Sequence, residues 1–153
     1  MALLETGQMA PTFKGQNLTG PEFHLENLKG NKPLVLVFGP DQVNPVQTKV
    51  TAGVYNKVRN DVEIVIMSRK LPSIAMAKAF LAQYGLKCPV VYDPKQEVYK
   101  MYGVEKPVVI FSIDKDGNIK NVAEYDPRGM STAQLEEAAA KAKGTVETPA
   151  AAA

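Results

Sequence analysis

Very few side chains in this sequence could act as a nucleophile or bind a metal ion. The chain has 153 residues, with one cysteine, Cys88, and one histidine, His24. A thiolate is the nucleophile of peroxide reduction and of other thiol-based redox chemistry, so Cys88 is the one candidate for such chemistry. A single cysteine excludes an intrachain disulfide, and together with a single histidine it excludes a Cys/His zinc site. We therefore expect no metal and no cofactor.

Cys88 itself has two interpretations. It could be a relocated reactive thiol whose pKa is lowered by the neighbouring Lys87. It could equally be a small buried hydrophobe, because free cysteine is among the most buried residue types. Adjacent residues on a strand point to opposite faces, so Lys87 would not face the thiol. The sequence favours the buried cysteine.

Two other candidate sites have structural explanations. His24 has no second ligand or nucleophile in its pattern, so we expect it to be a surface residue. The run Asp114-x-Asp116-Gly117-Asn118 faintly resembles a calcium loop, but Tyr125 stands where such a loop closes with a glutamate. A hairpin turn explains these residues better.

The elements that must position Cys88 follow from hydrophobic patterns. The continuous apolar run Leu34–Phe38 predicts a strand buried on both faces, at the centre of a sheet. Further strands are expected at 62–67 and 108–113. The Asp116-Gly117 turn then predicts that 118–125 returns as a hairpin partner.

Apolar residues three and four apart predict helices between and after the strands. Ser73 is the expected N-cap of one helix, and Gly85 is its expected end. Ser131 and Gln134 have the spacing of a capping box for the last helix. The four predicted helices cover 47–60, 73–84, 95–102 and 132–143.

This order of elements predicts an α/β fold in one domain, residues 1–143, followed by a flexible tail over 144–153. Two strand–helix–strand crossovers require parallel pairing at the centre of the sheet. Helices on both faces of a mixed sheet that ends in an antiparallel hairpin give a thioredoxin-like sandwich.

Composition excludes several classes of function. Eighteen basic and 16 acidic residues leave a formal charge of +2 without a basic cluster, which argues against nucleic-acid binding. The longest strictly apolar run, Leu34–Phe38, is far shorter than the roughly 18 residues of a membrane span. No secretory signal pattern is visible, and we expect a cytoplasmic protein.

Several motifs, in the same order and spacing, resemble the peroxiredoxin family. They cover roughly residues 7–140, and the resemblance implies a peroxiredoxin-type thioredoxin fold and a member of a thiol-based antioxidant family. The matching segments are G-Q-M-A-P-T-F at 7–13, F-H-L at 23–25, L-K-G at 28–30, the V-Y-D-P segment at 91–94, E-V-Y-K-M-Y-G-V at 97–104 and F-S-I-D-K-D-G at 111–117.

The resemblance also implies where peroxide chemistry would occur, in a P-x-x-x-T-x-x-C loop that enters a helix. Here Pro40 is in register, Asn44 stands at the threonine position and Gln47 at the position of the peroxidatic cysteine. The position of the family's active-site arginine is occupied by Val108. An amide has no lone pair as nucleophilic as that of a thiolate and cannot form a sulfenic acid. We therefore expect no peroxidase mechanism at these vestigial positions.

Two functions from different classes remain. The main hypothesis is a catalytically inactive peroxiredoxin-like protein that serves as a binding, assembly or regulatory subunit. Its partner, or a second copy of the chain, would bind the face formed by residues 40–47 and by Lys106 and Pro107, which carries exposed amides and stiff prolines. The alternative is an atypical thiol oxidoreductase or antioxidant protein that uses Cys88.

Overall fold

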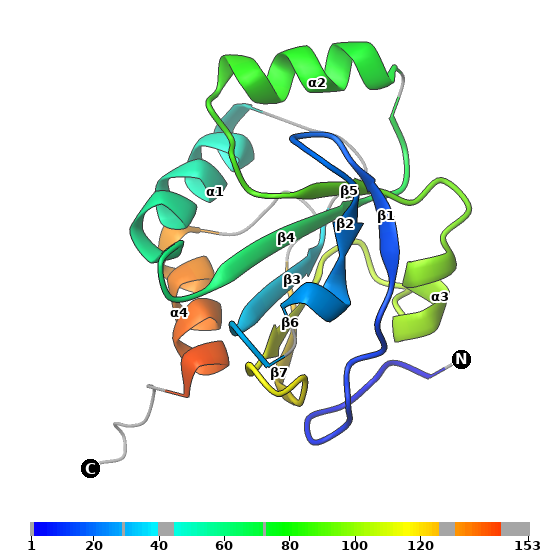
Figure 1. Cartoon of the computed structure of the whole chain (residues 1–153), viewed down its shortest axis with the longest axis vertical. Helices are drawn as coiled ribbons and strands as arrows, with labels where there is room; N and C mark the ends of the chain where they lie inside the picture. The colour runs from blue at the N-terminus through cyan, green and yellow to red at the C-terminus, as the bar shows by residue number, and fades with distance from the viewer. Residues whose placement is uncertain (1, 29, 40–44, 72, 126–130, 145–153) are drawn as a thin grey trace.

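A single mixed sheet organises the molecule (Figure 1). The computed structural model describes residues 2–28, 30–39, 45–71, 73–125 and 131–144. Within these residues, seven strands lie in the order β2-β1-β5-β4-β3-β6-β7. The strands are β1 (Lys14–Asn17), β2 (Phe23–His24), β3 (Leu34–Phe38), β4 (Glu63–Ser68), β5 (Val90–Tyr92), β6 (Val109–Ile113) and β7 (Ile119–Glu124).

β3 is the central strand that its apolar run predicts. All five of its residues are buried, because layers cover both of its faces. It pairs in parallel with β4 and antiparallel with β6, and β4 pairs in parallel with β5. β6 and β7 form the predicted antiparallel hairpin. The predicted α/β class, the central strand and the mixed sheet are therefore confirmed.

Helices cover both faces of the sheet. Besides the 3-10 turn η1 (Leu25–Asn27), the described helices are α1 (Pro45–Val58), α2 (Ile74–Gln83), α3 (Glu97–Tyr102) and α4 (Thr132–Lys143). One core cluster joins α1, α2 and α4 to the sheet, and the other joins α3, η1 and the N-terminal segment to its opposite face. In Figure 1, α1 and α4 lie side by side, and an ion pair of 2.6 Å between Lys57 and Glu136 connects them.

Several helix ends follow their predicted caps. Ser73 accepts a hydrogen bond from the Met76 amide at the start of α2. Ser131 and Gln134 form both bonds of the capping box at the start of α4. Gly144, with φ of 78°, ends α4, because glycine adopts the left-handed region without a Cβ clash.

Other boundaries differ from the prediction. α1 begins at Pro45, two residues before the predicted start, since a proline fits the first turn of a helix, where its missing N–H is not needed. α3 begins at Glu97 rather than at residue 95. The buried carboxylate of Asp93 accepts hydrogen bonds from the amides of Glu97, Val98 and Tyr99, which fixes that start.

The strands β1 and β2 were not predicted, because they are short and only four and two residues long. None of the described helices is long and apolar enough to cross a membrane. The predicted tail, apart from Gly144, lies outside the described residues, so its flexibility stays a prediction.

Candidate functional site around Cys88

Cys88 lies in a short loop between the end of α2 and the start of β5. The loop leaves α2 through a Schellman motif, in which the Leu86 amide bonds to the Leu81 carbonyl and the Gly85 amide to the Ala82 carbonyl. Gly85 has φ of 67°, a conformation that glycine adopts at no steric cost. The end of α2 therefore determines the direction in which residues 86–89 approach the sheet.

Hydrogen bonds hold this loop in place on both sides. The Thr19 hydroxyl donates to the Cys88 carbonyl at 2.8 Å, and the Ile66 amide of β4 donates to the Pro89 carbonyl at 3.0 Å. The Val90 amide donates to Oδ1 of Asn17 at 3.1 Å. These bonds pair the carbonyls of Cys88 and Pro89 and the amide of Val90, and they fix the loop on the sheet with the Cys88 side chain in the core.

The thiol of Cys88 is completely enclosed. The residue is 0% exposed, and it packs in the core cluster with Val54, Tyr55 and Ile64. Burial raises the pKa of the Cys88 thiol, and the nearby Glu63 carboxylate raises it further, because both oppose a second negative charge. The prediction of a buried cysteine is confirmed, and in this closed form the thiol is protonated and shielded from reagents.

Tyr55 and Glu63 are the titratable neighbours of this thiol. Burial raises the pKa of the Tyr55 hydroxyl, and Glu63 raises it further through its charge and a hydrogen bond. Cys88 is itself one of the groups that raise the pKa of Tyr55, so the two side chains interact electrostatically. The surroundings therefore favour the neutral forms of both the thiol and the phenol.

The positions that the peroxiredoxin resemblance assigned lie apart from this thiol. Pro40 and Asn44 are outside the described residues. Gln47 is half-buried in the first turn of α1. Cys88 shares a core cluster with Tyr55 and raises its pKa, so the two side chains are close. Tyr55 lies eight residues after Gln47 on α1, which is about 12 Å at 1.5 Å per residue. The thiol and the Gln47 position are therefore separate sites.

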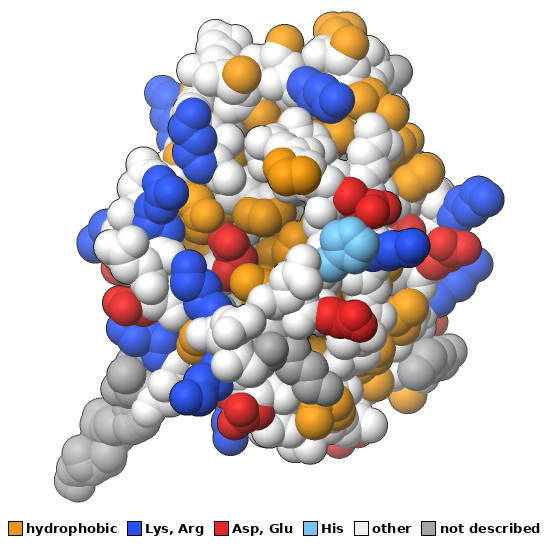
Figure 2. Space-filling view, viewed as in Figure 1, with side chains coloured by type: hydrophobic (Ala, Val, Ile, Leu, Met, Phe, Trp, Pro, Cys, Tyr) orange, Lys and Arg blue, Asp and Glu red, His pale blue; other side chains and the backbone are white. Residues whose placement is uncertain are grey.

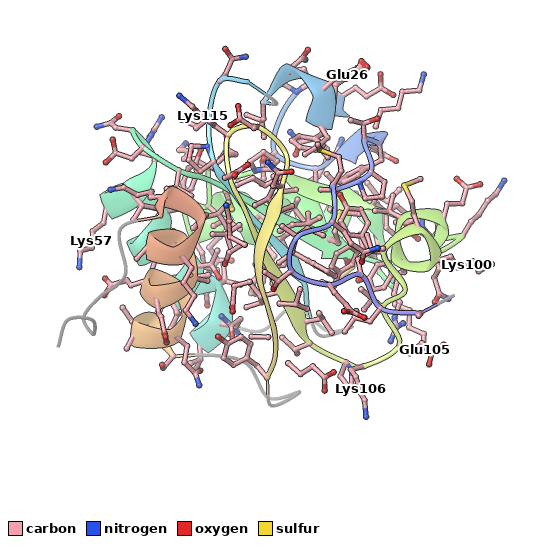
Figure 3. All side chains as sticks on the ribbon, turned by 90° about the horizontal axis from the view of Figure 1, so that it is seen from below. Glu26, Lys57, Lys100, Glu105, Lys106 and Lys115 are labelled. Carbon is pink, nitrogen blue, oxygen red and sulfur yellow. The ribbon has the colours of Figure 1, made fainter. Side chains whose placement is uncertain are left out.

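Val108 is 0% exposed directly before β6, and its carbonyl accepts a hydrogen bond from the Tyr125 amide. Glu105 and Lys106 precede Val108 in the chain, and Figure 3 shows their side chains pointing away from the protein. Val108 is thus a core residue, while the charged side chains of the loop before it point to solvent.

The two remaining candidates have the structural roles that the sequence predicts. His24 is partly exposed, and its Nε2 lies 3.1 Å from a carboxylate oxygen of Glu22. Oδ1 of Asp114 accepts hydrogen bonds from the amides of Asp116 and Asn118, which closes the hairpin turn. Within the described residues, no three His, Cys, Asp or Glu side chains come together in a way that could hold a metal ion.

Sequence reasoning missed Asn17, Thr19, Tyr55 and Glu63. The Asn17 side chain accepts from the Thr19 amide at 3.0 Å, an Asx turn that the Asn-x-Thr-Gly run could have indicated. The contact between Thr19 and Cys88 joins residues 69 apart in the chain. No local pattern predicts such a contact.

Comparisons with known proteins agree with this fold. The model of the AhpC/TSA family matches residues 6–122. The thiol-disulfide oxidoreductase ResA of Bacillus anthracis is 34% identical over 119 residues, which cover 76% of this chain and 68% of that protein.

Two solved structures share the fold. A secreted disulfide oxidoreductase of Mycobacterium tuberculosis superposes with a TM-score of 0.68 at 20% identity, over 82% of this chain and 92% of its own. The peroxidoxin BcpB of Mycobacterium tuberculosis superposes with a TM-score of 0.73 at 23% identity, over 94% of this chain and 99% of its own.

These relatives overturn the main functional expectation from the sequence. A catalytically inactive binding, assembly or regulatory subunit was expected because three peroxidatic positions carry other residues. The relative at 34% identity is instead named for thiol–disulfide oxidoreduction. That expectation is wrong, and the finding favours the alternative, a thiol oxidoreductase. The physical reason for the error is that missing peroxide-binding groups say nothing about exchange between thiols and disulfides.

Proposed function

Because this chain belongs to the AhpC/TSA family, we propose that it acts in thiol–disulfide exchange, with Cys88 as its reactive group. The observation that carries the proposal is the 34% identity to a thiol-disulfide oxidoreductase in a chain that has only one thiol. Any covalent thiol chemistry of this chain must therefore pass through Cys88.

A single thiol limits the reaction to exchange through a mixed disulfide. The Cys88 thiolate, having lost its proton to water, attacks one sulfur of a disulfide in a partner protein. The partner's S–S bond breaks, and its other sulfur leaves as a thiolate that takes up a proton. A second thiol, from a small molecule or another protein, then attacks the mixed disulfide and releases Cys88 as a thiol. One disulfide is consumed and one is formed, so electrons balance without a second cysteine in this chain.

The exchange requires the loop over residues 85–89 to open. In the closed form, burial raises the pKa of Cys88 and no reagent reaches its sulfur. Opening hydrates the thiol and removes the cause of that shift. Lys87 and Cys88 lie in a loop and not on the strand that the sequence suggested, so in the open loop the exposed Lys87 can approach the thiolate and favour it. The loop can open locally, because the hydrogen bond that Thr19 donates to Cys88 and the one that Asn17 accepts from Val90 each contribute little net stability in competition with water.

Exchange fits this chain better than reduction of peroxides. Peroxide reduction needs donors and a positive charge arranged around the attacking thiolate. By the peroxiredoxin resemblance those positions hold Asn44, Gln47 and Val108, and Cys88 lies elsewhere. A disulfide substrate carries its own leaving thiolate and needs no such pocket.

Finer statements about partners and location stay predictions. Contact with a protein partner or a second copy through the 40–47 face is supported by Val46, an apolar side chain 73% exposed at the start of α1. A cytoplasmic location is a prediction of the same kind.

The test is an exchange assay with a disulfide-linked model peptide and reduced glutathione. Wild type is expected to accelerate exchange above the uncatalysed rate and to yield a mixed disulfide at Cys88 in mass spectra. Cys88→Ser should return the rate to background, whereas Lys87→Gln should keep part of it. Equal rates for wild type and Cys88→Ser would overturn the proposal.

A further inference from the structure

The outer face of α2 is unusual for an exposed helix. The helix buries Ala77 and Leu81 against the sheet, so the residues on its opposite side face solvent. Met76 is 68% exposed there, a large apolar side chain without cover. We call the α2 outer face the exposed residues Ala75, Met76, Lys78, Ala79, Ala82 and Gln83.

The segment of the chain that contains α2 carries charge of one sign. From residue 64 to residue 92 the sequence contains no aspartate or glutamate, but it contains Arg69, Lys70, Lys78 and Lys87. Figure 2 shows basic and hydrophobic side chains at the top of the molecule, over α2, with the acidic side chains lower in the view. A chain of net charge +2 thus concentrates its excess charge at one end.

Arg69 bonds to Gln96 and lies over the Tyr99 ring of α3, but the three lysines are available to a partner of α2. Among the described residues, no carboxylate forms an ion pair with Lys70, Lys78 or Lys87, whereas Lys57, Lys141 and Lys143 each have one. Lys49 of α1 adds a fourth positive charge at the end of α2, where its Nζ lies 5.9 Å from the centre of the Tyr84 ring. α2 therefore exposes Met76 on one flank of its outer face and the unpaired Lys78 on the other, with the short side chains of Ala75, Ala79 and Ala82 between them.

We infer that the α2 outer face binds an acidic polypeptide segment that forms an amphipathic helix. Acidic side chains of the segment would pair with the surrounding lysines, and its apolar side chains would contact Met76. Methionine suits such a contact because its flexible thioether adapts to different partners. Next to Met76 the short side chains of Ala75 and Ala79 let a second helix approach closely.

The side chains favour a polypeptide over a lipid surface. Helices that lie in a membrane interface insert bulky tryptophan, phenylalanine or leucine side chains into the acyl region. On the α2 outer face Met76 is the only long apolar side chain. A second copy of the chain docking through the same face is disfavoured, because two surfaces of equal positive charge would meet.

This surface goes beyond the proposed exchange reaction and does not depend on it. Its test uses wild-type protein and a synthetic 16-residue peptide of leucine and glutamate at helical spacing, without cysteine. Binding is measured by backbone amide NMR shifts. A failure of Cys88 chemistry would leave this result unchanged, and a failure of binding would leave the exchange assay unchanged.

Saturable binding is expected, with shifts confined to α2 and the residues beside it and with affinity falling as salt rises. Met76→Asp and Lys78→Glu should each weaken binding several-fold. Lys100→Glu makes the same charge change on α3, which packs on the other face of the sheet, and should leave binding unchanged (Figure 3). Circular dichroism and urea unfolding verify that each variant is folded.

Three results would overturn the inference. The first is absence of saturable binding at millimolar peptide. The second is equal weakening by Lys78→Glu and Lys100→Glu. The third is binding to phosphatidylserine vesicles without binding to the acidic peptide, which would assign the face to a membrane surface instead.

Discussion

The hydroxyl of Thr19 donates a hydrogen bond of 2.8 Å to the carbonyl oxygen of Cys88. The bond joins the segment that follows β1 to the loop that carries the only thiol of the chain. The thiol is buried, so in the proposed exchange the loop must open, and the strength of this contact then sets how often the thiol reaches solvent.

Thr19→Val removes the hydroxyl and keeps the shape of the side chain. A hydrogen bond of this kind contributes a net stability of about 0.5–1.5 kcal/mol, so labelling of Cys88 by a thiol reagent should become about 2–10 times faster. Thr6→Val, at a residue in the N-terminal segment, is the matched control and should label at the wild-type rate. Identical labelling of both variants would show that this bond does not hold the loop.

The buried thiol also predicts a pH dependence of stability. Above its ordinary pKa of about 8.5, the Cys88 thiol of the unfolded chain loses its proton, while the folded state, in which the pKa is raised, keeps it. The unfolded state then binds fewer protons, so the free energy of unfolding falls as pH rises, by up to about 1.4 kcal/mol per pH unit from this group.

Urea unfolding between pH 8 and pH 10 measures this slope. Cys88→Ala should have a shallower slope than wild type over that interval, whatever its stability at pH 7. Burial raises the pKa of Tyr102 in the same way, but that hydroxyl affects both proteins equally and only above about pH 10. Parallel slopes for the two proteins would contradict the account of the buried thiol.

Two glycines should respond to alanine in opposite directions. Gly103 ends α3 with φ of 71°, and a Cβ there would meet the backbone of Ala2 and Leu3, which crosses over it. Gly103→Ala should therefore destabilise the fold by about 2 kcal/mol or more, since the left-handed conformation alone costs an alanine about 1–2 kcal/mol.

Gly53, an exposed residue of α1, has open space where a Cβ would be placed. Gly53→Ala should stabilise the protein by roughly 0.5–1 kcal/mol, because alanine loses less backbone entropy in a helix. Thermal unfolding of both variants tests the pair, and loss of stability in Gly53→Ala would be the unexpected result.

Local patterns predicted the parts of the fold that depend on neighbouring residues. The apolar run of β3, the Asp116-Gly117 turn and the cap at Ser73 each specify a structure within a few residues. The start of α3 was placed two residues early, because the side chain that fixes it, Asp93, lies four residues before the helix begins. The role of Asp93 depends on the geometry of the loop, which the spacing of apolar residues does not predict.

The site was predictable only in part. The burial of Cys88 could be predicted from its residue type, because an isolated cysteine behaves as a small hydrophobe. Its contacts with Thr19 and Tyr55 come from segments that only the folded sheet brings together. The functional expectation was wrong because the absent peroxidatic groups bear on peroxide reduction and not on exchange between thiols and disulfides.

The central claim is that Cys88 reacts through local opening of residues 85–89. Its most direct test is the rate at which a thiol reagent labels Cys88 at several urea concentrations, all of them low. If opening is local, the labelling rate measured well below the unfolding midpoint should rise only slightly with urea, since little surface is exposed. The labelling rate should also exceed the rate expected if the thiol were exposed only by global unfolding, as calculated from the free energy of unfolding. A rate that follows the full urea dependence of global unfolding would mean that the thiol is reached only in the unfolded chain, and it would contradict thiol–disulfide exchange by the folded protein.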